Sequence, residues 1–200
     1  MNTNSRTAPK RGKGRGEMKH WTDSIPTNAC ADAVAYCKTQ RSFAAAWKDC
    51  KRGDWMLWIL GRLAGPVGDP KRKPLVLAAC ACARLSLKRV KKGEDRPRLA
   101  IETAERWARG KATIKQVQAA AAAAANAYAA AAADAAYAAY AVDAADADYA
   151  TYADYAAADA YAAGGADYAA ATAARTGVLA QCAGIVRVHY PRPPKLEPKP

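Results

Sequence analysis

The feature that most constrains the fold is a low-complexity tract from residue 119 to residue 174. Alanine occupies 35 of its 56 positions, and the tract holds seven aspartates but no lysine, arginine or glutamate. Alanine has the highest helix propensity of the amino acids, so the tract is predicted to be helical. Because an aspartate recurs every few positions and each would be costly at the centre of a bilayer, the tract is not expected to span a membrane.

Eight tyrosines also lie in this tract, and at about 100° per residue they fall all around a helix. One straight helix of this length would extend roughly 84 Å and could not bury them all. We therefore predict two or three helices, with Gly164 and Gly165 as the clearest break. Alanine lets helix axes approach closely, while tyrosine can fill gaps and keep its hydroxyl in water.

Start and stop signals predict short helices before the tract. Thr27-Asn28 can cap a helix that ends near Lys38, Ser42 can cap a second that stops at Gly53, and Asp54 can cap a third over 55–65. Pro74 suits the first turn of a fourth helix over 75–92, which Gly93 would end.

Three further helices complete the prediction. Pro97 opens one that Gly110 closes, the T-x-x-Q pattern of Thr113 and Gln116 starts the long tract, and a last short helix covers 178–190. Together these signals predict an all-α fold, either an antiparallel helical bundle or stacked helical hairpins. We expect one helical domain over 20–190, a disordered basic tail over 1–19 and a mobile, polyproline-like tail over 191–200, where five of ten residues are proline.

The charge is divided unevenly along the chain. The net charge is +13, the tract carries −7, and the remainder therefore carries +13 − (−7) = +20. The basic part predicts either contact with nucleic-acid phosphates or a solvated surface with a solubilising tail. The candidate nucleic-acid-binding residues are Arg11, Lys13, Arg15, Lys88, Arg89, Lys91 and Lys92.

The acidic tract suggests a basic partner, because spaced carboxylates can imitate a row of phosphates and tyrosine is a favoured interface residue. Alternatively, tyrosine and alanine form a core seam and aspartate keeps the helices soluble. The candidate partner-binding residues are Asp143, Asp146, Asp148, Tyr149, Tyr152, Asp154 and Tyr155.

The six cysteines and two histidines suggest no catalytic or metal site. No secretory signal is recognised in the polar, basic first twenty residues, so we expect reduced thiols in a cytoplasmic protein. Cys80 and Cys82 point about 200° apart on a helix, and the other spacings do not match those of zinc modules. We therefore expect buried, unbridged cysteines, no metal, no cofactor and no enzymatic activity.

The segment TQRSFAAAWKDCKRGDWMLWILGRL (39–63) resembles a family of immunity proteins from bacterial polymorphic toxin systems, also found in phage genomes. The resemblance continues through 75–87, 96–113 and 185–191, and is most specific in GDWMLW and AIETAERWARG. It implies an all-helical protein that binds and neutralises a protein toxin, without catalysis. The alternative that the residues leave open is a phage or bacterial nucleic-acid-binding accessory protein.

Overall fold

In the computed structural model, the described residues are 20–66, 68–131 and 168–196, and all regular structure within them is helical. The predicted all-α class is thus confirmed for this part of the chain. The α-helices are α1 (Ala31–Lys38), α2 (Phe43–Asp49), α3 (Gly53–Leu63), α4 (Lys73–Ala83), α5 (Arg96–Ala108), α6 (Ile114–Ala131) and α9 (Tyr168–His189). Short 3₁₀ helices are η1 (Trp21–Ser24), η2 (Pro70–Arg72) and η3 (Leu87–Arg89).

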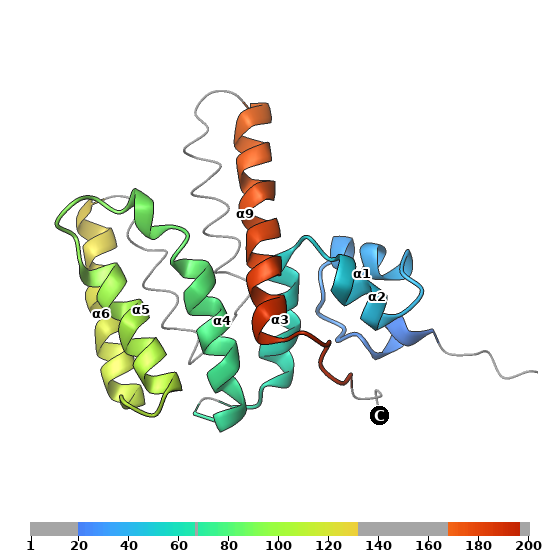
Figure 1. Cartoon of the computed structure of the whole chain (residues 1–200), viewed down its shortest axis with the longest axis horizontal. Coiled ribbons are helices and arrows are strands. Elements are labelled where there is room, and N and C mark those ends of the chain that lie inside the picture. The colour runs from blue at the N-terminus through green and yellow to red at the C-terminus, as the bar shows by residue number, and fades with distance from the viewer. Residues whose placement is uncertain (1–19, 67, 132–167, 197–200) are drawn as a thin grey trace, which may run out of the picture.

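Five of the helices form a row in the order α6, α5, α4, α9, α3, in which each contacts the next (Figure 1). α9 follows the other helices in sequence but lies inside the row, between α3 and α4. α1 and α2 contact each other and lie beyond α3, at the opposite end from α6. This arrangement of packed helices agrees with the predicted bundle or hairpin architecture.

Several predicted helix ends are confirmed by the local geometry. The Ser42 hydroxyl accepts a hydrogen bond from the amide of Ala45 at 3.2 Å, as an N-cap does. Thr113 and Gln116 form a reciprocal capping box, with the Thr113 amide donating to Gln116 Oε1 at 2.8 Å and the Gln116 amide donating to Thr113 Oγ1 at 3.2 Å. Pro74 lies in the first turn of α4, and Gly110 follows α5 with a φ of 73°.

Other predicted ends are wrong. α1 begins at Ala31 rather than directly after Thr27-Asn28, and Gly53 begins α3 instead of ending α2. α4 ends at Ala83, not near Gly93, because the chain turns there and forms η3. The last helix is longer than predicted, since α9 already begins at Tyr168.

The core consists mainly of small and aliphatic side chains from α3, α4, α5 and α9. Leu57, Leu75, Ala78, Ile101 and Val186 have no exposed surface. α3 and α9 approach so closely at Gly53 that a Cβ there would lie 2.4 Å from Cys182 Cβ and 2.6 Å from the amide nitrogen of Ala183. Gly53 is therefore needed for the close crossing of these two helices.

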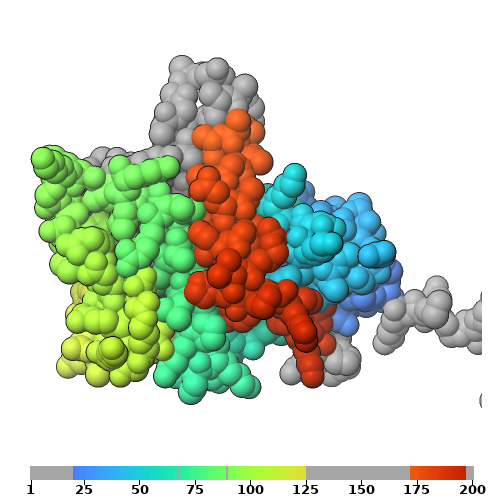
Figure 2. Space-filling model, in the orientation of Figure 1, coloured from blue at the N-terminus to red at the C-terminus, as the bar shows by residue number. Residues whose placement is uncertain are grey.

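The chain turns away from the row after α9. Residues 190–196 form no helix, and Figure 2 shows the C-terminal residues on the surface between α9 and the N-terminal helices. Leu196, which belongs to the tail predicted to be mobile, is partly buried against the core. The tail over 1–19 and the predicted break at Gly164 and Gly165 lie outside the described residues. No helix in the described ranges is both long and apolar enough to cross a bilayer.

Candidate functional site

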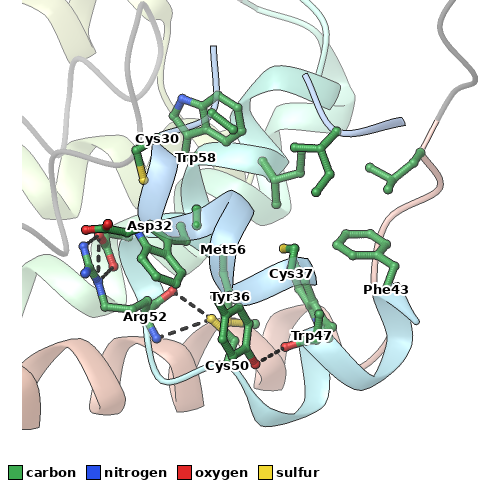
Figure 3. Close-up of a pocket in the computed structure, with 18 of the residues that line it drawn as sticks. Cys30, Asp32, Tyr36, Cys37, Phe43, Trp47, Cys50, Arg52, Met56 and Trp58 are labelled. Carbon is green, nitrogen blue, oxygen red and sulfur yellow. Dashed lines mark hydrogen bonds and ion pairs between the residues drawn. The ribbon is translucent and has the colours of Figure 1, made fainter. Parts of the chain in front are cut away.

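Aromatic side chains concentrate where α1, α2 and α3 meet, and they surround a cavity of about 410 Å³ (Figure 3). A cavity of this size falls in the range that binds small molecules or inserted side chains. The aromatic residues that line it are Tyr36, Phe43, Trp47, Trp55 and Trp58. The other lining residues are Ile25, Asn28, Ala29, Cys30, Asp32, Ala33, Cys37, Ala46, Cys50, Arg52, Asp54, Met56, Ile59 and Leu196.

An ion pair at the start of α3 forms one wall of the cavity. Asp54 is 1% exposed, and its carboxylate accepts a hydrogen bond from Arg52 Nε at 2.8 Å and a second from Arg52 Nη2. The Arg52 guanidinium also lies over the Trp55 ring, 4.4 Å from its centroid. Asp54 is thus the buried partner of Arg52 and not the helix cap that was predicted. The pair fixes the orientation of Trp55 at the cavity wall.

Burial keeps the Tyr36 hydroxyl and the thiols of Cys37 and Cys50, which lie beside the aromatic rings, in their neutral forms. The Tyr36 hydroxyl donates to the carbonyl of Ala46 at 3.0 Å, and burial raises the pKa of Tyr36 to about 12. Burial likewise raises the pKa of the Cys37 thiol to about 11, and it raises the pKa of the Cys50 thiol. A thiol with a raised pKa is a poor nucleophile at neutral pH. These groups suit the binding of an apolar group better than catalysis.

Hydrogen bonds connect the end of α9 and the residue after it with α2 and the residue that follows α2. Arg187 Nη1 donates to the carbonyl of Cys50 at 2.7 Å, after α2. The Trp47 indole Nε1 donates to the carbonyl of Tyr190 at 3.0 Å. Trp47 is 3% exposed, whereas Trp55 and Trp58 are only partly buried. The two partly buried rings are therefore accessible for contact with another molecule.

The predicted partner-binding residues of the acidic tract all lie outside the described residues, and so do Arg11, Lys13 and Arg15. The predicted contact through the tract stays a prediction. Of the predicted basic residues in the described ranges, Lys88 is exposed on η3, Lys91 and Lys92 are exposed in the loop that follows, and Arg89 belongs to η3.

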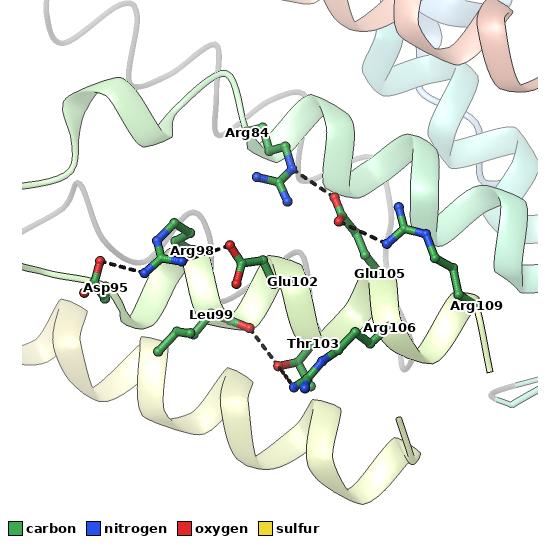
Figure 4. Close-up of polar contacts among 9 residues, drawn as sticks. All are labelled: Arg84, Asp95, Arg98, Leu99, Glu102, Thr103, Glu105, Arg106 and Arg109. Carbon is green, nitrogen blue, oxygen red and sulfur yellow. Dashed lines mark hydrogen bonds and ion pairs between the residues drawn. The ribbon is translucent and has the colours of Figure 1, made fainter. Parts of the chain in front are cut away.

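Much of the arginine charge near these lysines is paired with carboxylates (Figure 4). Arg84 Nε lies 2.9 Å from Glu105 Oε1, and this arginine lowers the pKa of Glu105. Arg98 lies 2.9 Å from Glu102 and 3.1 Å from Asp95. The run of arginines between 84 and 98 therefore presents less uncompensated positive charge than its sequence indicates.

Four of the six cysteines are buried as predicted, whereas the prediction is wrong for Cys30, which is exposed, and Cys37 is only partly buried. Cys50, Cys80, Cys82 and Cys182 are buried and unbridged, and in the described ranges no cluster of three or more histidine, cysteine or acidic residues could hold a metal ion. The Cys80 thiol donates to the carbonyl of Ile101 at 3.8 Å. The Cys82 thiol donates to the carbonyl of Cys182 at 3.9 Å. These thiols link α4 to α5 and α9.

The sequence interpretation did not identify the cavity. None of the five aromatic residues that line the cavity is among the predicted partner-binding residues. The missed signal is the density of aromatic residues, five between Tyr36 and Trp58, in a chain with little aromatic content elsewhere before the tract.

Comparison with models of known protein families, with curated proteins and with solved structures finds no match for this chain.

Proposed function

We propose that this chain is a non-enzymatic binding protein of the immunity type, which neutralises a protein toxin by direct contact. The aromatic cavity carries the proposal. Segment 39–63, where the resemblance to immunity proteins is strongest, contributes Phe43, Trp47, Trp55 and Trp58 to its wall. Tryptophan, tyrosine and arginine are the residues most enriched among those that dominate protein interfaces.

The chemistry of the cavity suits an inserted apolar side chain. Its rings offer apolar surface, and the carboxylate of Asp54 is already paired with Arg52. An incoming apolar group therefore does not leave that charge without a partner. Exposed Asp32 adds a carboxylate to the lining, which favours an anchor from a basic protein surface.

The test is binding of the protein encoded by the gene adjacent to that of this chain. The full chain should bind it, and Trp58→Ala should weaken the complex at least about thirtyfold, as loss of a dominant interface residue does. The predicted contact through the acidic tract is tested in parallel by reversing the charge at Asp143, Asp146, Asp148 and Asp154. Unchanged affinity in both variants would contradict both site assignments.

Nucleic-acid binding is the second candidate. It is favoured by Lys88, Lys91 and Lys92, which are exposed and form no ion pair with the described residues. If it is correct, binding to a DNA or RNA duplex should fall steeply with salt and decrease when the three lysines are replaced by glutamine. No retention of duplex at low salt would remove this candidate.

A further inference from the structure

The end of the chain reaches the same cavity. The Trp47 indole donates to the carbonyl of Tyr190, which fixes the point where the segment leaves α9. Six residues later, Leu196 lines the cavity and is partly buried against the core. Figure 3 shows the C-terminal segment passing the end of the cavity at which Phe43 lies. A cavity of about 410 Å³ persists with Leu196 at its wall.

The sequence of this segment, Pro-Arg-Pro-Pro-Lys-Leu over 191–196, has a recognisable binding chemistry. Proline restricts the backbone before binding, so a proline-rich segment loses little entropy when it lies in a groove. Aromatic-lined grooves bind such segments in many recognition domains. Pro193, Pro194 and Leu196 are partly buried, whereas Arg192 and Lys195 are exposed. Pro193, Pro194 and Leu196 are thus the apolar residues of the segment that contact the protein, whereas Pro191 is exposed.

From this arrangement we propose that the aromatic cavity binds a proline-rich peptide segment with a leucine-like anchor, and that Leu196, at the end of the segment 191–196, is its resident, displaceable occupant. The inference rests on the proposed function, because it names the chemistry of the partner segment that enters the cavity. A partner segment competes with Leu196, which lines the cavity. The apparent dissociation constant for the partner is therefore the intrinsic one divided by the fraction of molecules in which Leu196 is displaced.

The test uses the full chain and an amidated peptide of sequence PRPPKL, with binding followed by tryptophan fluorescence. Leu196→Ser weakens the resident occupant, so this variant should bind the peptide about tenfold more tightly than the wild-type chain. Lys195→Ser is the matched control, because it changes the adjacent exposed residue, and it should bind as the wild type does. A peptide with serine in place of leucine should bind neither to Leu196→Ser nor to Lys195→Ser.

Two results would overturn the inference. One is equal affinity of Leu196→Ser and wild type for the peptide, including no binding to either; the other is equal binding of the leucine and serine peptides. A concentration-dependent dimer of the wild type that is lost in Leu196→Ser would instead assign the cavity to the tail of a second copy, and would also overturn it.

Failure of the inference and failure of the proposed function give different results. If the peptide binds as expected but the adjacent gene product does not bind, the function is wrong and the peptide chemistry stands. If the gene product binds and Trp58→Ala weakens it while the peptide binds to no variant, the function stands and the inference is wrong.

Discussion

Two regions of the molecule bury apolar surface with different kinds of side chain. One is the interface between α4 and α5, and the other is the region around α1 to α3. On α4 and α5 many of the buried residues are small or aliphatic and at most 1% exposed, among them Ala78, Ala79, Cys80, Cys82, Ala100, Ile101 and Ala104. Around α1 to α3 the packing residues are large rings, and a cavity remains among them. Small side chains let α4 and α5 pack closely on each other, whereas a cavity remains among the rings around α1 to α3.

The largest effect is expected where two helices are closest. Gly53→Ala places a Cβ against Cys182 and the backbone of α9, which cannot move aside as a flexible side chain can, and should cost about 3 kcal/mol of the free energy of unfolding. Urea denaturation measures this cost. Gly184→Ala is the control, because a Cβ there meets nothing within 4 Å, and it should stabilise α9 by about 0.5–1 kcal/mol. Equal stability of the two variants would refute the tight α3–α9 crossing.

A smaller effect is expected at the ion pair in the cavity wall. Arg52→Met leaves the buried Asp54 carboxylate without this guanidinium and should cost about 2 kcal/mol, less than for a fully buried pair because Arg52 is partly exposed. The matched control is Arg98→Met, whose pairs with Asp95 and Glu102 lie at the surface, and which should change stability by less than about 0.5 kcal/mol. Thermal unfolding compares the two, and a larger loss in the control would contradict the role given to the buried pair.

The smallest effect is expected on the pH dependence of stability under alkaline conditions. The Cys37 thiol has a pKa of about 11 in the folded protein, above the ordinary value of 9.0 that applies to the unfolded chain. Between these values the unfolded chain has lost a proton that the folded chain retains, so the contribution of Cys37 to stability falls as pH rises from 9 to 11. Cys37→Ala should therefore have a shallower loss of stability over this range than wild type in urea titrations. Exposed Cys30→Ala serves as the control, and a slope in Cys37→Ala as steep as in wild type would be inconsistent with burial of this thiol.

The sequence predicted the helical class and those helix ends that depend on local chemistry. Ser42, Pro74 and the Thr113–Gln116 capping box act within one turn of the chain, so their effect can be read from neighbouring residues. The ends at Gly53 and Ala83 could not be read in this way. Gly53 is required because α9, more than a hundred residues away in sequence, packs directly against it. In the sequence alone, a glycine at a contact between helices looks the same as a glycine that ends a helix.

The candidate site was harder to predict than the fold. The cavity combines residues from α1, α2, α3 and the C-terminal segment, and periodicity along one helix does not reveal which rings from different helices meet. The net charge of the basic part was also misleading, because it includes the charges of Arg84 and Arg98, which are paired with carboxylates. Their partners Glu105 and Glu102 lie 21 and 4 residues away in sequence, and the tertiary contact of Arg84 appears only when α4 packs on α5.

The central claim is that the aromatic cavity, rather than the basic surface, binds a protein partner. The most direct measurement is the dissociation constant of the adjacent gene product for the full wild-type chain, for Trp58→Ala and for a variant with Lys88, Lys91 and Lys92 changed to glutamine. We predict at least about thirtyfold weaker binding for Trp58→Ala and a change of less than about threefold for the lysine variant. Wild-type affinity in Trp58→Ala, together with a large loss in the lysine variant, would contradict the account.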